Sequence, residues 1–399
     1  MKTLAFAMIL AASAPAAHAS QADTGLSQRY QAHDPDSRVQ VDYSIFSHIL
    51  DSIIYDVGPS DRRVARGRLI ETGSRINRQS TSDYRYEGNR IWFHLLNDEH
   101  KDTIHQYRLE LEQLPAQVDL ADLSRNEQLA YWLNLHNAVL IDEIARAYPV
   151  RYTNTIHVDG ERLFDAPIID LPGGSISLNQ LRNDIVLSQW SDPRVLYGFY
   201  TGAIAGPSIQ ERAFTGAQVW RQLDRIGEEF VNALRGVEGD GRVVDVSAIY
   251  HDHDYLFPNW PEDLRRHLLT YANGEVEPAV RQAERFGQIA FDTSLADLTH
   301  GTRCGGGGFN PVSSVNVQTG ERDFSGRCDA IPAQAANLII EVRERRQRLF
   351  EAGRLGRVTL RDIPTEDPDE APSVEERPGQ PVLIRRGGSG TPDEPDSEE

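Results

Sequence analysis

Residues 126–150 read NEQLAYWLNLHNAVLIDEIARAYPV, a helix-length run that is apolar on almost every side. Its centre nevertheless carries three polar side chains, Asn134, His136 and Asn137. A buried amide or imidazole left without hydrogen-bond partners costs about 1–3 kcal/mol. We therefore expect these side chains to serve a fixed hydrogen-bond network, in which Asn134 and Asn137 are bonded to backbone from the turn around residues 201–207.

The ends of this helix are also marked in the sequence. Asp122 or Ser124 can cap its first turn, Glu127 stands three residues after Ser124, and Pro149 marks its exit. Around it, apolar residues recur at helical or strand spacing. The expected helices are 41–57, 103–114, 179–187, 218–234, 262–271 and 333–350, and the expected strands lie around 176, at 195–200 and near 242–246. The pattern predicts a helix-rich α+β single domain with a small sheet.

Three stretches in a fixed order suggest a relationship. They are LAYWLNLHNA at 129–138, ISLNQLRNDIV at 176–186 and DPRVLYGFYTGAIAGPSIQERAFTG at 192–216. Together they resemble the domain of unknown function 547 family, whose members centre on a Leu-Ala-Phe-Trp-Ile-Asn-Leu-Tyr-Asn-Ala helix. The resemblance is strongest from about residue 43 to residue 271.

The chain departs from the family pattern at several positions. The family often has an Asn-Cys-Gly-x-x-Ser-Cys-Pro turn, and both cysteine positions are lost here, becoming Thr201 and Gly206. A family Glu appears as Arg182, and the Tyr of the helix motif appears as His136. We therefore expect this member to have no cysteine-type activity.

The helix and the turn after residue 200 together suggest a polar pocket or groove. His136 could act as a general acid or base near neutral pH, and Thr201 could replace the family cysteine as a nucleophile. The candidate binding residues are Trp132, Asn134, Asn137, Pro207 and Ser208.

A purely structural interpretation of the same residues remains open. The asparagines can tie the helix to neighbouring backbone, His136 can be a satisfied core histidine, and the small residues Gly202 and Gly206 can serve a tight turn alone. Because both family cysteines are lost, we favour a non-catalytic module that binds or scaffolds an envelope protein, a peptide or a glycan. The alternative is a hydrolase-like enzyme with a hydroxyl nucleophile.

Other candidate chemistry is weaker. His251, Asp252, His253 and Asp254 could place two histidines on one face of an extended segment, but a third ligand at diagnostic spacing is missing, so we expect a polar loop and no metal or cofactor site. The formal net charge of −19 argues against binding nucleic acid or anionic membranes.

The ends of the chain carry targeting and tail signals. Lys2, the apolar run 4–12 and Ala17-His18-Ala19 are typical of a secretory signal, and no later run is long enough for a transmembrane segment. We expect a periplasmic protein. The predicted organisation is a signal peptide at 1–19, a polar leader at 20–38, the family-type domain with a C-terminal helix at 39–360, and a disordered acidic tail at 361–399.

The cysteines of the chain are Cys304 and Cys328, on either side of a glycine-rich stretch. In an exported protein such a pair favours a disulfide, which would stabilise the fold by about 3.5 kcal/mol on a chain-entropy model. The four glycines Gly305–Gly308 lack the Gly-Lys-Ser/Thr that a phosphate-binding loop needs. The sequence therefore predicts a surface loop closed by a disulfide.

Overall fold

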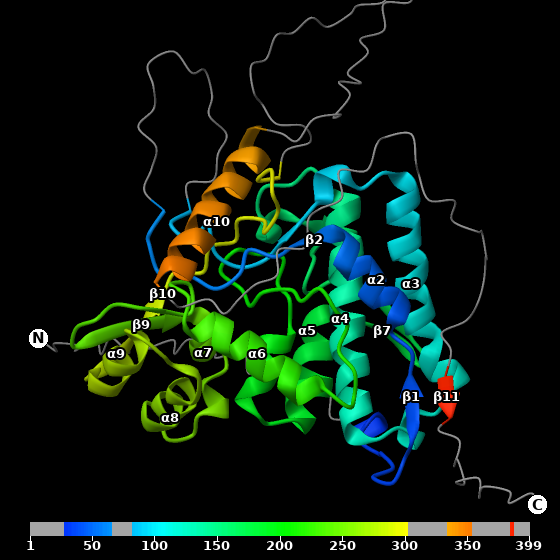
Figure 1. Ribbon diagram of the computed structural model, residues 1–399. Helices are drawn as coiled ribbons and strands as arrows, with labels where there is room; N and C mark the ends of the chain where they lie inside the picture. The colour runs from blue at the N-terminus through cyan, green and yellow to red at the C-terminus, as the bar shows by residue number, and fades with distance from the viewer. Residues whose placement is uncertain (1–27, 66–81, 302–332, 353–383, 387–399) are drawn as a thin grey trace, which may run out of the picture.

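The computed structural model describes residues 28–65, 82–301, 333–352 and 384–386 (Figure 1). The sequence motif forms α4 (Arg125–Ala147), and every side chain from Glu127 to Asp142 is buried. A helix enclosed on all sides must be apolar all round, which explains the unbroken hydrophobicity of the motif. The fold is α+β and rich in helix, as the sequence predicts, with several small sheets.

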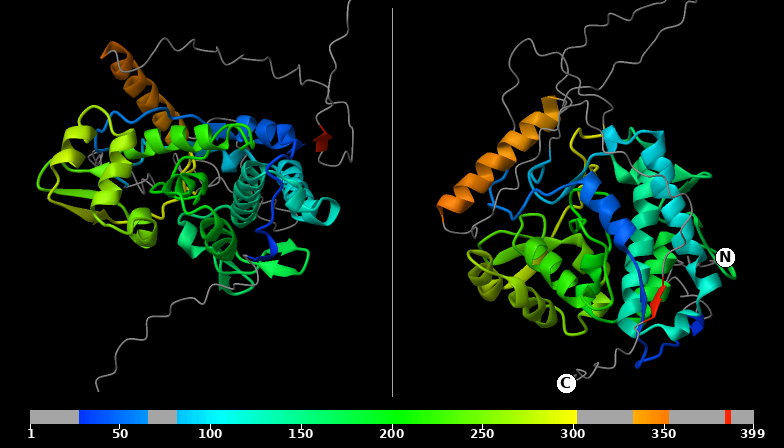
Figure 2. Two further views of the ribbon diagram at one scale, coloured as in Figure 1. Left: turned by 90° about the horizontal axis from the view of Figure 1, so that it is seen from below. Right: turned by 45° about the vertical axis from the view of Figure 1, so that its right-hand side comes forward.

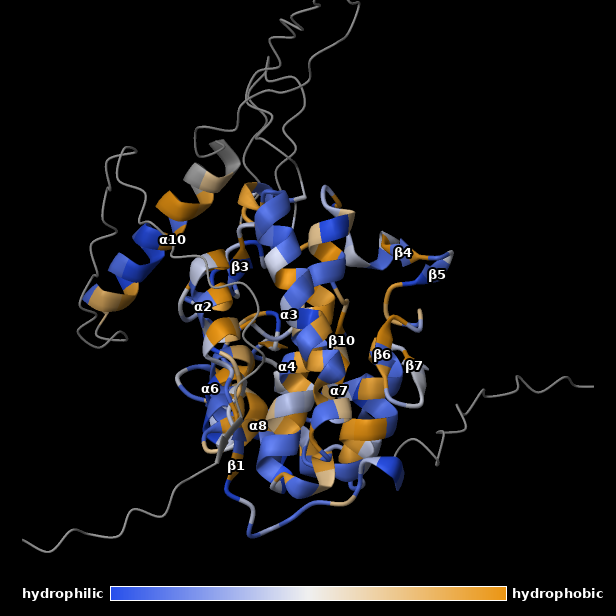
Figure 3. Cartoon of the chain, turned by 90° about the vertical axis from the view of Figure 1, so that its right-hand side faces the viewer, coloured by the Kyte–Doolittle hydropathy of each residue, from blue (hydrophilic) through white to orange (hydrophobic). Residues whose placement is uncertain are grey.

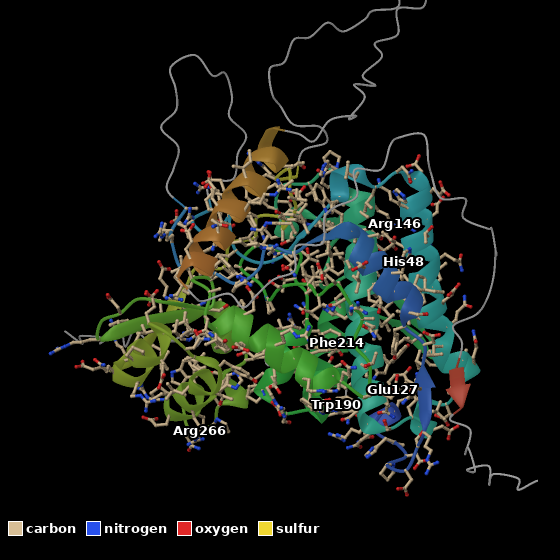
Figure 4. All side chains as sticks on the ribbon, viewed as in Figure 1. His48, Glu127, Arg146, Trp190, Phe214 and Arg266 are labelled. Atoms are coloured by element: carbon tan, nitrogen blue, oxygen red, sulfur yellow. The ribbon has the colours of Figure 1, made fainter. Side chains whose placement is uncertain are left out.

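Both ends of α4 follow the expected signals. Ser124 is the N-cap, and its side chain accepts a hydrogen bond from the backbone N–H of Glu127 at 3.3 Å. The Glu127 carboxylate does not close a capping box; it accepts from the backbone N–H of Val41 at 3.1 Å and of Gly216 at 3.2 Å. The start of the helix is therefore tied to two distant chain segments, and Figure 4 labels Glu127 there.

Helix α3 (Asp98–Gln117) packs along α4, as Figure 1 shows. A buried arginine joins the two helices: Arg108 binds Glu112 on its own helix and both Asp142 and Glu143 on α4. The shorter helix α2 (Ser44–Ile53) lies nearby and buries one face. In Figure 3, hydrophobic and hydrophilic residues alternate around the outer helices, as expected for helices that bury one side.

The largest sheet has the strand order β10-β9-β8, with β9 antiparallel to β8 and parallel to β10. Strand β8 is Val237–Glu238, β9 is Val243–Ser247 and β10 is Arg285–Ile289. Between β9 and β10 the chain forms α7 (Ala248–Asp252), α8 (Glu262–Tyr271) and α9 (Val276–Gln282). Helix α6 (Val219–Val231) precedes the sheet. The short antiparallel pairs are β2 (Ile54–Tyr55) with β3 (Arg90–Ile91), β4 (His157–Val158) with β5 (Glu161–Arg162), and β6 (Ile169–Leu171) with β7 (Gly174–Ile176).

Two sequence predictions of local structure are wrong, and a third is confirmed as a helix of different geometry. Residues 195–200 were expected to form a buried strand, but Pro193–Gly198 form a 3₁₀ helix. A short apolar run does not distinguish a strand from a buried helical turn, and Asp192 caps this one through the backbone N–H of Arg194. The expected helix at 179–187 begins as α5 (Leu178–Gln180) and continues as a π-helix, Leu181–Leu187. Residues 251–254 are not extended, because His251 lies in α7.

Helix α10 (Ala333–Glu351) matches the C-terminal helix predicted at 333–350. It lies at the edge of the molecule (Figure 2). Its basic face is paired: Arg345 binds Asp61 at 2.9 Å and Arg346 binds Asp56 at 2.8 Å. Of the predicted acidic tail the structure describes β11 (Ile384–Arg386), which pairs antiparallel with β1 (Val39–Val41). Among the described helices, none is long and apolar enough to cross a lipid bilayer.

Candidate functional site

Asn134 holds one distant backbone segment against α4. Its Nδ2 donates to the carbonyl of Phe214 at 2.8 Å, and its Oδ1 accepts from the N–H of the same residue at 2.9 Å. The amide thus completes both backbone hydrogen bonds of Phe214, whose position Figure 4 labels. The side chain is 1 % exposed, so both groups would be unsatisfied without it.

Asn137, one helical turn later, holds a second backbone segment against α4. Its Nδ2 donates to the carbonyl of Gly198 at 3.1 Å, and its Oδ1 accepts from the N–H of Tyr200 at 3.0 Å. We expected both asparagines to be buried and bonded to backbone, and they are; the predicted partners within 201–207 were wrong. The two amides instead fix residues 198–200, immediately before the turn, and Phe214, farther along the chain after it.

His136 is a neutral, enclosed imidazole. The oxygen of Asn137 can only accept, so His136 Nδ1 donates to it at 3.1 Å, and this leaves Nε2 as an acceptor. Among the described residues, Nε2 has no hydrogen-bond partner although it is buried. Burial lowers the pKa of His136 to about 3, with Arg182 adding to the effect. The expectation that His136 titrates near neutral pH is therefore wrong, and it is not a fully satisfied core histidine either.

Trp132 and Pro207 lie in the core. Trp132 has no exposed surface and packs against Tyr30 and Tyr131, with ring centroids at 5.0 and 4.8 Å. Tyr30 comes from the predicted polar leader, so part of that leader belongs to the folded domain. Pro207 is also buried. Neither residue is placed as the wall of an open groove.

Thr201 and Gly206 face one another across the turn. A Cβ added at Gly206 would lie 2.0 Å from Thr201 Oγ1 and 3.1 Å from Thr201 Cβ. The Thr201 hydroxyl accepts from the N–H of Ala203 at 3.3 Å. The other side of the turn is braced by a later segment, because Ile204 N–H donates to Ser294 O at 2.8 Å. The threonine thus occupies the space that a side chain at position 206 would need.

Ser208 belongs to a different cluster. Its Oγ accepts from Arg235 Nη2 at 3.0 Å and from the backbone N–H of Asn89 at 3.2 Å. Arg235 also binds Glu229 at 2.6 Å. No hydrogen bond joins Thr201 or Ser208 to His136 or Asn137 within the part of the chain that the structure describes. The proposed hydroxyl nucleophiles and their proposed base are therefore not brought together.

Arg182, which the sequence marks only as a departure from the family pattern, is a further polar group near the motif helix. Arg182 lies on the π-helix, and π-helical turns are rare and concentrate at functional sites. Its charge lowers the pKa of both His136 and His253, although burial is the larger cause for each. Tyr255, which is 55 % exposed, lies beside His253, with ring centroids 6.0 Å apart and the rings tilted by 53°. The half-buried position of Arg182 had no sequence signal.

A second unforeseen feature is the buried carboxylate of Asp297. It accepts hydrogen bonds from Tyr148 Oη at 3.2 Å, Thr299 Oγ1 at 3.0 Å and the Gly301 N–H at 2.9 Å. Burial raises its pKa to about 6, against the effect of these donors. Asp297 stands within the run SLADLT, where nothing distinguishes it from a surface aspartate.

The histidines that the sequence analysis considers as metal ligands, His251 and His253, are bonded to backbone. His251 Nε2 donates to Gly287 O at 3.0 Å and His253 Nδ1 donates to Ile249 O at 2.8 Å. In the described ranges no group of three or more His, Cys, Asp or Glu side chains is placed to hold a metal ion. The predicted pair Cys304 and Cys328, and the predicted signal peptide at 1–19, lie outside the described residues.

Comparison with known families places this geometry in context. Residues 120–231 match the model of the family described as protein of unknown function, DUF547. The match is shorter than the expected 43–271, but it contains α4, the π-helix and the turn from Thr201 to Ser208. Comparison with curated proteins and with solved structures found no match. Residues 120–231 of the chain are therefore similar to the DUF547 family.

Proposed function

We propose that this protein is a non-catalytic binding or scaffolding module of the bacterial cell envelope. The observation that carries the proposal is the use made of the polar residues of α4. Asn134 and Asn137 are both fully engaged with backbone, at Phe214 and at residues 198–200. A catalytic amide must remain available to a substrate, whereas these two serve the fold.

The candidate nucleophiles support the same conclusion. A threonine or serine hydroxyl needs an adjacent base to attack a substrate. Thr201 is hydrogen-bonded to Ala203, and Ser208 is held by Arg235 beside Glu229. His136 gives its only described hydrogen bond to Asn137, and its lowered pKa makes it a weak base at neutral pH.

Turnover assays distinguish the module from the hydrolase. The mature protein would be incubated with a chromogenic acyl ester, a peptide mixture and a glycan mixture, beside Thr201→Ala and His136→Ala. We expect the parent protein to show no more turnover than either variant. Turnover by the parent that disappears in Thr201→Ala or His136→Ala, with the fold intact by circular dichroism, would establish the hydroxyl-nucleophile enzyme instead.

The location in the envelope rests on the N-terminal sequence. Lys2, the apolar run 4–12 and Ala17-His18-Ala19 supply the three regions of a secretory signal. We expect the exported protein to begin at Ser20 and to fractionate with the periplasm. Intact-mass measurement of the exported protein tests this, and retention of residues 1–19 would reject the secretory signal.

The predicted disulfide follows from that location. Cys304 and Cys328 would be oxidised in the periplasm and would close the glycine-rich loop between them. Titration of the native exported protein with a thiol reagent should find no free thiol before reduction and two after it. Two reactive thiols in the native protein would rule out the disulfide.

A further inference from the structure

Helix α10 is attached to the domain through charged side chains. Arg345 Nε lies 2.9 Å from Asp61 Oδ1, and both side chains are 5 % exposed. Arg348 Nη2 lies 3.3 Å from the other oxygen of Asp61. A second pair joins Arg346 to Asp56 at 2.8 Å. The helix thus places three arginines on two aspartates of one short irregular segment.

The apolar residues of α10 are not part of the main core. Ala335, Val342 and Leu349 are buried, but none of the three belongs to the hydrophobic core cluster formed by the described residues. Ile340 and Phe350 are 52 % and 53 % exposed. In Figure 2 the helix lies on the outside of the fold. Attachment of α10 therefore depends strongly on its arginines.

The arginine contacts are of a kind that stabilises weakly. Arg345 Nη1 donates to Tyr86 O, but Nη2 is buried and has no hydrogen-bond partner in the part of the chain that the structure describes. A buried ion pair stabilises a contact only when the remaining protons are also bonded, because both charges lose their hydration. The side chains of Arg346 and Arg348 are 34 % and 38 % exposed, and salt screens pairs of this kind.

The segment that α10 contacts, residues 56–61, also touches a buried polar network. Ser60 Oγ donates to a carboxylate oxygen of Glu87. The Glu87 carboxylate in turn accepts from the backbone N–H of Leu234 at 3.0 Å and of Arg235 at 3.1 Å. Ser60 and Glu87 are 6 % and 2 % exposed. The segment therefore lies between α10 and this carboxylate.

Arg235 extends the connection to the turn that ends at Ser208. Its Nε donates to Gly206 O at 3.1 Å, and its Nη2 donates to Ser208 Oγ at 3.0 Å. Arg62, which follows the segment, is bound separately, because its Nη1 donates to Val237 O at 3.0 Å. Loss of the α10 contacts would therefore loosen residues 56–61 and leave the chain beyond them in place.

We propose that α10 is a salt-sensitive strap over the Glu87–Arg235 network. While its arginines bind Asp56 and Asp61, the helix holds residues 56–61 against Glu87. When ionic strength rises, the exposed pairs weaken, the helix and the segment open together, and the network that fixes the turn at Ser208 becomes accessible. The inference goes beyond the proposed function, because it concerns access to the turn and not what binds there.

Hydrogen–deuterium exchange of the mature full-length protein, followed by mass spectrometry, tests the strap. Raising NaCl from about 0.1 M to about 1 M shortens the Debye length from about 10 Å to about 3 Å. We expect exchange in α10 and in residues 56–61 to become at least ~5-fold faster. The amides of Leu234 and Arg235, which donate to Glu87, should accelerate with them. The buried helix α4 is the internal control and should not change.

Asp61→Asn tests the same contact at low salt. The substitution removes the carboxylate shared by Arg345 and Arg348 without changing α10. Exchange in α10 should become at least ~10-fold faster, with a smaller further effect of salt. Glu277→Gln is the matched control, because it breaks an exposed pair with Arg281 at 2.6 Å in α9 and should leave exchange in α10 unchanged.

Asp56→Asn keeps the test decisive if Asp61→Asn does not fold. Its carboxylate is 49 % exposed, so the variant should fold and should accelerate the same segments by a smaller factor. Faster exchange in α10 alone, with the amides of Leu234 and Arg235 unchanged, would overturn the proposal, because the helix would then not hold the network. Exchange in α10 that responds neither to salt nor to these substitutions would overturn it as well.

Discussion

At the scale of single residues, the side chain of Thr201 accounts for the glycine at position 206. The family cysteine positions are these two, and they stand face to face across the turn, with a Cβ at 206 placed 3.1 Å from Thr201 Cβ. A β-branched residue at 201 fills the space between them, so only glycine fits at 206. The two departures from the family pattern are therefore one coupled change in packing.

This coupling predicts a non-additive pair of substitutions. Gly206→Ala should destabilise the protein by about 1–3 kcal/mol, because its methyl group would overlap Thr201 Oγ1. In Thr201→Ala/Gly206→Ala the hydroxyl is gone, so the added methyl should cost much less. Urea denaturation of the four proteins in a double-mutant cycle measures the coupling. Additive losses would show that the turn relaxes instead.

At the scale of secondary-structure elements, the sequence located the helices well and the short irregular pieces poorly. Ser124 and Pro149 mark the ends of α4 through local chemistry, and α8 was predicted with its observed bounds. The 3₁₀ helix at Pro193–Gly198 was missed because a short apolar run does not distinguish a strand from a buried helical turn. The helix predicted at 179–187 is present, but its π-helical geometry was not predicted. The partners of Asn134 and Asn137 could not be assigned, since they depend on how segments far apart in sequence meet.

The junction of α3 with α4 gives a prediction at this scale. Arg108→Met should destabilise the protein by about 3–5 kcal/mol, because it leaves the buried carboxylate of Glu112 without its cation and takes one of two arginine partners from Asp142, which keeps Arg146. Arg281→Met, which breaks an exposed pair with Glu277, should cost at most about 0.5 kcal/mol. Guanidinium denaturation of both variants checks the contrast. Equal losses would mean that the α3–α4 network contributes no more than a surface pair.

At the scale of the whole molecule, the buried histidines make the fold acid-sensitive. Burial lowers the pKa of His136 to about 3 and that of His94, His267 and His300 to about 4. A histidine whose folded pKa is lowered takes up its proton more readily when unfolded, so stability is lost as the pH falls below about 6.5. Asp297 acts in the opposite sense, because its raised pKa of about 6 favours the folded state at low pH.

We therefore expect the free energy of unfolding to fall between pH 7 and pH 5, with His136 alone contributing about 2 kcal/mol of the decrease. His136→Phe should reduce the pH dependence by that amount. Asp297→Asn should make it steeper, since the opposing group is removed. Urea midpoints at the two pH values provide the test. A pH dependence unchanged in His136→Phe would show that this imidazole is not held neutral by burial.

The central claim is that the asparagines of α4 hold the chain in place on either side of the turn through hydrogen bonds to its backbone. It is tested most directly by the free energy of unfolding of Asn137→Leu. The substitution leaves the carbonyl of Gly198 and the N–H of Tyr200 buried without partners, so we expect a loss of about 2–4 kcal/mol. Stability equal to that of the parent protein, measured by urea denaturation, would contradict the claim and would return Asn137 to the residues available to a ligand.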